Sequence, residues 1–162
     1  MITAQHEQDS AATATPDRIE GRQNWMSVLA RASADDIACR LSGLHPLPRY
    51  RLIRGPETGL VMVQGRAGGD GVPFNLGEVT VTRCTLCLED GRVGHAYVAG
   101  RDARQAELAA LVDAWLLDES ARARVLAAVI DPLAVVQRDA AAEVSRRAAA
   151  TKVEFFTMTQ MR

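Results

Sequence analysis

The chain has 162 residues, which is typical of one domain, and a formal net charge of −1, from 19 Lys and Arg against 20 Asp and Glu. This balance excludes the strong positive charge that attracts nucleic acid or an anionic membrane surface, and no apolar run approaches the roughly 18 residues of a membrane span. Three cysteines without a secretory signal favour a cytoplasmic location.

The composition divides the chain into three parts. Residues 1–20 are rich in Gln, Thr, Ala and acidic side chains, and they predict a disordered leader. Residues 21–150 are expected to form a single α+β domain, because short β-rich runs lie between helical patterns. Residues 151–162 are expected to form either a C-terminal strand or an extended arm that contacts another subunit.

Two helices are expected at the start of the domain. The spacing of Trp25 and Leu29 predicts a short amphipathic helix over 23–32. Ser33 has the side chain of an N-cap, with acidic residues directly after it, so a second helix begins there. Gly43 is expected to end this second helix.

The middle of the domain carries the strand pattern. Short runs rich in β-branched residues predict four strands, at 50–54, 60–66, 79–88 and 92–99. Gly55-Pro56 is expected to break the first strand from the second, and Asp90-Gly91 is a hairpin signal between the third and fourth. Strands joined by short turns favour an antiparallel meander.

A glycine-rich loop, residues 65–71, joins the second and third predicted strands. It resembles a phosphate-binding loop in its glycine content, but it lacks the Lys-Ser/Thr pair of such a loop and does not open onto a helix. Turn geometry is therefore the favoured interpretation.

Three helices are expected after the strands. The 3.6-residue spacing of apolar side chains predicts helices over 101–118 and 123–130. Asp131-Pro132 is typical of an N-cap followed by proline, so a third helix is expected from there to residue 150. Its apolar stripe is thin and suggests that it needs a partner; the stripe consists of Leu133, Val136, Ala140 and Val144.

Two adjacent phenylalanines, Phe155 and Phe156, lie in the strand-like run that ends at Met158. Neighbouring residues of a strand point to opposite faces, so the two rings require cover on both sides. An internal strand of the sheet and an arm docked on another subunit both satisfy this requirement.

Few side chains suggest catalysis. Cys84 and Cys87 form a C-x-x-C inside a predicted strand, where the two thiols face opposite ways, so we expect buried structural cysteines and no metal site. His95 has the chemistry of a general base, although an isolated histidine is usually a surface or core residue.

Three arginines near the sheet are the candidate substrate-binding residues. Arg66, Arg83 and Arg101 together have the charge to clamp an anionic ligand. The simpler interpretation is that they form ion pairs with nearby acids, namely Glu57, Glu78 and Asp102.

Six segments of the chain form a recognisable series: Arg22–Ala30, Glu57–Val61, Gln64 with Arg66 and Gly68-Gly69, Thr82-Arg83, Gly100–Asp102, and Val153–Met158. In this order they resemble the PhnG family of the bacterial phosphonate carbon–phosphorus lyase system. Each segment is short, but the six together, with the C-terminal Phe-Phe, make a specific match over nearly all of 22–158.

The resemblance implies a cytoplasmic subunit of a complex with PhnH-, PhnI- and PhnJ-type subunits and a PhnL-type ATPase. That complex converts ATP and methylphosphonate into alpha-D-ribose 1-methylphosphonate 5-triphosphate and releases adenine, with the nucleosidase activity in PhnI. The family provides no secure catalytic residue or cofactor for this chain alone.

The expected partner contacts are Phe155, Phe156 and Met158. The alternative hypothesis is an independent anion- or nucleotide-binding enzyme that uses the arginine cluster.

Overall fold

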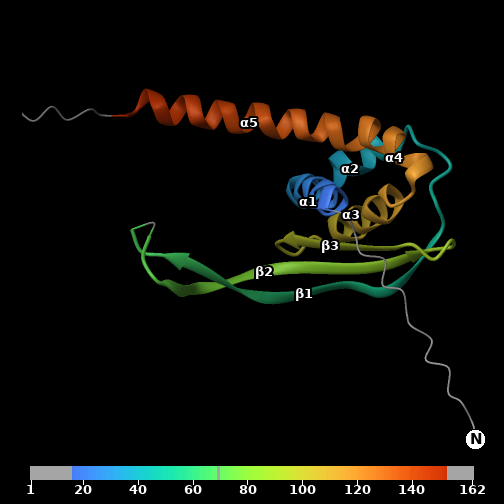
Figure 1. Ribbon diagram of the computed structural model, residues 1–162, viewed down its shortest axis with the longest axis horizontal. Coiled ribbons are helices and arrows are strands. Elements are labelled where there is room, and N and C mark those ends of the chain that lie inside the picture. Colours follow the sequence, from blue (N-terminus) through green and yellow to red (C-terminus); the bar gives the residue numbers. More distant parts are fainter. Residues whose placement is uncertain (1–15, 69, 153–162) are drawn as a thin grey trace, which may run out of the picture.

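The computed structural model describes residues 16–68 and 70–152. Helices cover one face of a three-stranded antiparallel sheet, so the α+β meander with helices at both ends is confirmed (Figure 1). In chain order the elements are α1 (Pro16–Arg31), α2 (Ala34–Leu41), β1 (Tyr50–Arg66), β2 (Pro73–Leu88), β3 (Val93–Ala99), α3 (Ala103–Leu116), α4 (Glu119–Val125), the π-helical turn η1 (Leu126–Ile130) and α5 (Asp131–Ala150). Residues 1–15 of the predicted leader and 153–162 of the predicted arm lie outside the described residues.

Side-chain caps begin two helices: Ser33 caps one as predicted, and Asp102 caps the helix that the sequence predicts from 101. Ser33 Oγ accepts the Asp36 N–H at 3.1 Å and begins α2, and Asp102 Oδ1 accepts the Gln105 N–H at 2.9 Å and begins α3. Each cap satisfies a backbone donor that has no partner within the first helical turn. α1 begins earlier than predicted, at Pro16, and so extends into the predicted leader.

The first two predicted strands are one strand. The expected break at Gly55-Pro56 is wrong: β1 runs through this pair, with shifts of register at and just before it. β1 lies at the edge of the sheet, where a proline at a bulge removes no ladder hydrogen bond. The sheet therefore has three strands in the order β1-β2-β3 and not the four expected.

β2 is longer than predicted, and only part of it has a neighbour on both sides. It begins at Pro73 and pairs with β1 along its whole length. β3 pairs with β2 only from Val81 to Cys87, so the rest of the β1–β2 hairpin is two-stranded. The glycine-rich loop is the turn of this hairpin, as predicted, with Gly68 at a φ of +66°.

α3 lies at the centre of the molecule, between the sheet and the other helices (Figure 1). Its Leu111 and Leu116 are fully buried, as are Leu86 and Val98 of the sheet beneath it. The closest approach is at Gly94 of β3, where an added Cβ would lie 2.1 Å from the Ala110 carbonyl oxygen of α3. A glycine at this position lets the helix backbone rest directly on the strand.

The predicted N-cap at Asp131 is wrong, because the chain is already helical there. α4, η1 and α5 follow one another without a break, and Asp131 N–H donates to the Leu126 carbonyl, the i to i−5 pattern of a π turn. Pro132 follows this wider turn and has no N–H that an α-helical bond would use. Within the described residues no helix has the length and hydropathy to cross a membrane.

Candidate functional site

The β1–β2 hairpin extends beyond the helices as a two-stranded arm, residues 60–80, which we call the hairpin arm (Figure 1). Its exposed large apolar side chains are Leu60, Val61, Met62, Val72, Phe74, Leu76 and Val79. The exposed fractions of Leu60 and Leu76 are 64% and 61%. A two-stranded hairpin alone is marginally stable in water, and clustered exposed apolar side chains are typical of a protein-binding surface.

Both faces of the hairpin arm carry apolar side chains. Val61 is paired with Val79 on the face that points away from the helices. Leu60 and Met62 lie on the opposite face, the one to which the buried Thr82 also belongs, because side chains alternate along paired strands. A partner that holds the arm therefore has to cover two surfaces.

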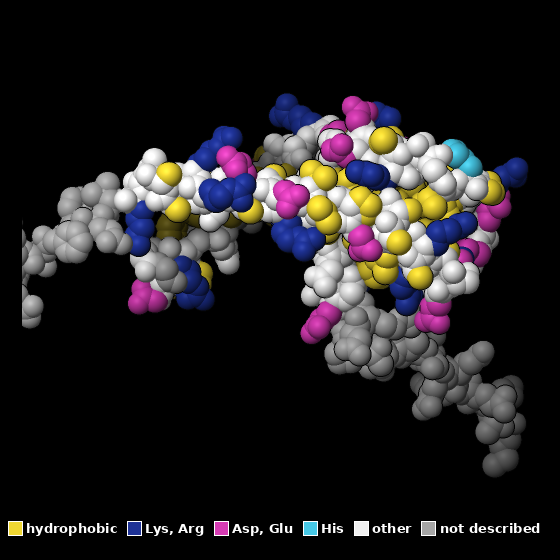
Figure 2. Space-filling model, turned by 90° about the horizontal axis from the view of Figure 1, so that it is seen from above, with side chains coloured by type: hydrophobic (Ala, Val, Ile, Leu, Met, Phe, Trp, Pro, Cys, Tyr) yellow, Lys and Arg dark blue, Asp and Glu magenta, His cyan; other side chains and the backbone are white. Residues whose placement is uncertain are grey.

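The second half of α5 is also uncovered. Leu133 is buried and Gln137 Nε2 donates to the Val28 carbonyl of α1 at 2.9 Å. Val136, directly before Gln137, and Val144, farther along, expose 58% and 66% of their surface, and α5 continues past α1 in the same direction as the hairpin arm (Figure 1). Figure 2 shows charged side chains between apolar ones along this helix. This exposure agrees with the prediction that the thin stripe needs a partner.

The three candidate arginines do not meet at one point. Arg83 pairs with Glu57 across the strands at 3.2 Å, which confirms the ion-pair interpretation for this residue. Arg66 lies nine positions farther along β1 than Glu57, or about 30 Å at the rise of a strand, and its Nη1 donates to the Gly71 carbonyl in the turn. Arg101 follows the end of β3.

The pairs expected for the other two arginines are not formed in the described part of the chain. The Asp102 carboxylate caps α3 and does not bind Arg101, and Glu78 forms no ion pair with Arg66. Contact of any of these arginines with substrate stays a prediction, but the geometry gives no single anion clamp.

The cysteines and histidine have ordinary surroundings. Cys84 and Cys87 are buried free thiols, as predicted, and burial raises the pKa of Cys84 to about 11. His95 is exposed, with its Nδ1 3.2 Å from Thr85 Oγ1. Within residues 16–68 and 70–152 no three side chains are grouped as metal ligands.

A fully buried carboxylate, Asp113 of α3, joins three elements. Its oxygens accept Arg22 Nε at 3.1 Å, Arg22 Nη2 at 2.7 Å, Trp25 Nε1 at 2.8 Å and the His95 backbone N–H at 2.9 Å. α1 and β3 are therefore both held to α3 by one side chain. Because four donors use the lone pairs of a carboxylate that water does not reach, its function is structural.

Sequence reasoning did not identify Asp113. The signals for it were indirect: Arg22 and Trp25 stand in the first of the six quoted segments, and Asp113 is the single charged residue in the apolar run 109–116. Spacing cannot show that these residues meet, because 88 or more positions separate them along the chain.

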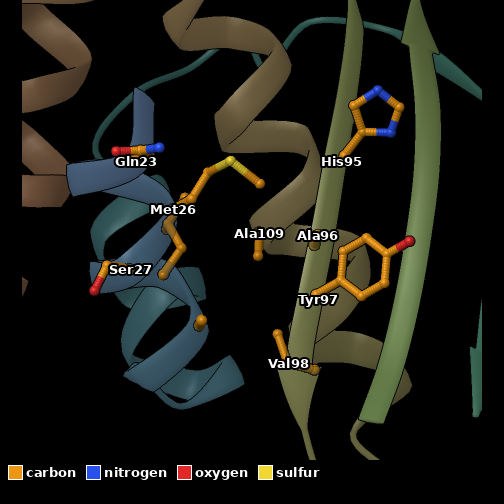
Figure 3. Close-up of a pocket in the computed structure, with 10 residues that line it drawn as sticks. Gln23, Met26, Ser27, His95, Ala96, Tyr97, Val98 and Ala109 are labelled. Atoms are coloured by element: carbon orange, nitrogen blue, oxygen red, sulfur yellow. The ribbon is translucent and has the colours of Figure 1, made fainter. Parts of the chain in front are cut away.

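A groove of about 350 Å³ lies between α1 and β3, the open edge strand of the sheet. Figure 3 shows Met26 of α1 extending toward the strand, with Ala109 of α3 behind it, and the Tyr97 ring turned over β2. The lining is mainly apolar, and Ala96 and Val98 contribute its strand side. Of the residues that line the groove, His95 is the one with the chemistry of a general base.

Comparison of the chain with known proteins gives two consistent results. Residues 20–160 match the family described as "Phosphonate metabolism protein PhnG". The chain belongs to the PhnG family. A PhnG from Rhizobium meliloti (strain 1021), named "Alpha-D-ribose 1-methylphosphonate 5-triphosphate synthase subunit PhnG", is 41% identical over 155 residues, which cover 94% of this chain and 97% of that protein.

Membership of the PhnG family confirms the resemblance drawn from the six segments. The match includes the hairpin arm, α5 and most of the predicted C-terminal arm. The exposed apolar surfaces of the hairpin arm and of α5 therefore lie within the region that matches the family.

Proposed function

We propose that this chain is a non-autonomous subunit of an alpha-D-ribose 1-methylphosphonate 5-triphosphate synthase in phosphonate catabolism. The complex would take ATP and methylphosphonate as substrates and release adenine. The observation that carries the proposal is the 41% identity, over nearly the whole of both chains, with the synthase subunit PhnG.

The surface of the chain supports the role of a subunit. The hairpin arm exposes apolar side chains on both faces, and α5 exposes Val136 and Val144. Such surfaces gain stability when a partner removes them from water, at about 25 cal/mol per Å² of apolar area. The described residues also lack a converging set of acid, base and nucleophile, which suits a chain that assists another subunit.

The proposed partner of the hairpin arm is a PhnI-type subunit, which would carry the nucleosidase activity. PhnH- and PhnJ-type subunits and a PhnL-type ATPase complete the proposed assembly, in the cytoplasm and without a cofactor bound by this chain alone. Arg83 and Arg66 are then separate candidates for contact with the triphosphate, since they lie at different levels of the hairpin.

Co-purification with a PhnI-type subunit tests the proposal. We expect the full chain to form a complex that releases adenine from ATP when methylphosphonate is present. Leu60→Asp and Leu76→Asp place a charge on the exposed hairpin arm and should abolish the complex, while Ile19→Asp, at a residue 47% exposed on α1, should leave it intact.

Two results would overturn the proposal. Unchanged assembly and adenine release by both arm variants would exclude the arm as the contact surface. A chain that stays alone when mixed with the PhnI-type subunit, yet binds ATP tightly in calorimetry, would instead support the alternative of an independent nucleotide-binding enzyme.

A further inference from the structure

The open edge of β3 presents unused backbone groups. Leu88 N–H donates to the Arg92 carbonyl and Gly100 N–H donates to the Thr80 carbonyl, at the two ends of the β2–β3 ladder. In an antiparallel ladder, hydrogen-bonded pairs alternate with non-bonded pairs. The even-numbered residues of β3 therefore bond to β2, and the N–H and C=O groups of Tyr97 point away from the sheet.

Asp113 confirms this alternation and marks where the edge is closed. It accepts the outward N–H of His95 at 2.9 Å. The edge is thus occupied near His95 and remains available at Tyr97, beside the groove between α1 and β3. An added strand at this position would continue the sheet, as in peptide recognition by β-strand addition.

We propose that the open edge of β3 and the adjoining groove receive the segment Val153–Met158 of a second copy of this chain as an added strand. This role goes beyond the proposed synthase function and does not depend on it. The segment has the β-branched and aromatic residues that suit a strand.

The two adjacent phenylalanines fit the two sides of this edge. If Phe156 lies opposite Tyr97, both rings are on the outer face of the sheet, where Tyr97 is 57% exposed. Phe155 then points to the other face, into the groove beside Met26 and Ala109. The groove, at about 350 Å³, lies within the range of about 300–1,000 Å³ of pockets that enclose ligands, so it has room for one aromatic ring.

The position of α5 favours a segment from another copy. Gln137 is bonded to α1 at Val28, and Ala150 is 13 positions farther on, or about 20 Å along the helix axis. Figure 1 shows this end of α5 beyond the end of β3. The five residues from Thr151 to Phe155 span at most about 18 Å. This is less than the length of α5 beyond Gln137, and α1 also lies between α5 and the sheet (Figure 1), so Phe155 does not reach the groove of its own chain.

A reciprocal exchange between two copies buries enough surface for a stable dimer. An enclosed phenylalanine buries about 150–250 Å², so the two groove-facing Phe155 rings contribute about 300–500 Å², and each Phe156 ring, against Tyr97 on the outer face, contributes part of that amount. The groove and edge that they cover lose a similar area, which with the backbone of the two added strands brings the total toward the lower end of the range of about 1,200–2,000 Å² for stable interfaces. A two-fold exchange also closes, because each copy supplies one segment and one groove.

The mass of the full chain in solution, without any other subunit, tests the proposal. We expect twice the 17.5 kDa of one chain. Phe155→Ser should return the mass to one chain, whereas the matched control Val144→Ser, at an exposed residue of α5, should not. A single-chain mass for the unchanged protein, or equal dimer from both variants, would overturn the proposal.

A disulfide test separates exchange between copies from pairing within one chain. In a Cys39→Ser background, which removes the exposed native thiol, one tagged chain carries Ala30→Cys in the groove and a differently tagged chain carries Phe155→Cys. Mild oxidation of the mixture should give a disulfide-linked dimer with both tags. A separate chain carries both substitutions. The proposal fails if a disulfide forms only within this doubly substituted chain and not between the two chains of the mixture, or if no disulfide forms in either experiment.

Discussion

Removal of the Asp113 carboxylate should be among the most damaging single changes to the fold. Asp113→Ala leaves the buried Trp25 Nε1 and the His95 N–H without an acceptor, and it leaves the Arg22 guanidinium without its partner. Each orphaned buried donor costs about 1–3 kcal/mol, and breaking a buried ion pair costs about 3–5 kcal/mol. Because the Arg22 side chain is 33% exposed and water can solvate part of its charge, we expect a total loss of about 4 kcal/mol.

Urea unfolding followed by circular dichroism, at one protein concentration, measures this loss. A domain is typically stable by about 5–15 kcal/mol, so the transition of Asp113→Ala should move to much lower urea. Asp113→Asn keeps one acceptor but loses the charge, and we expect about half the effect, near 2 kcal/mol.

The matched control is Asp35→Ala, which breaks an ion pair with Arg104 in which both side chains are mostly exposed. Exposed pairs contribute about 0–1 kcal/mol. If Asp113→Ala lost no more than this control, the conclusion that Asp113 holds α1 and β3 to α3 would be wrong.

Two further predictions concern single contacts. Gly94→Ala should lower the free energy of unfolding by about 1–3 kcal/mol or more, because the new methyl group meets the Ala110 backbone, while Gly59→Ala, with open space around it, should stay within about 1 kcal/mol of the original. Tyr50 donates to Glu107 at 2.6 Å, and this bond, with burial, raises the pKa of Tyr50 to about 12. The contribution of Tyr50 to stability should therefore be complete below its ordinary pKa of about 10 and be lost as pH rises toward 12; an ultraviolet titration in which Tyr50→Phe removes no late phase would contradict this.

Structural elements that depend on contacts between residues close in the chain follow the predictions made from the local sequence. Ser33 and Asp102 cap helices because a short polar side chain can reach a backbone N–H three positions away. The antiparallel order and the hairpin at Asp90-Gly91 followed from turn residues between β-rich runs. Burial of Cys84 and Cys87 followed from their place inside a strand.

Signals of the same local kind failed where a distant neighbour decided the outcome. Gly55-Pro56 does not end β1, because pairing with β2 holds the chain extended on both sides and an edge strand can absorb the bulge. Asp131 does not cap a helix, because the preceding π turn carries the helical path into Pro132. In both cases the element around the proline outweighs the local preference of that residue.

The family, the α+β class and the presence of apolar surface that needs cover can all be recognised from the amino-acid sequence. Which polar groups meet depends on the packed fold: Arg22 and Trp25 bind the buried Asp113, Arg83 pairs with Glu57, and Arg66 lies at the far end of the hairpin arm. Caps and turns depend on bonds within a few residues, which a sequence displays directly. Ion pairs and buried networks depend on distances between residues far apart in the chain, and those distances exist only once the sheet and helices have packed.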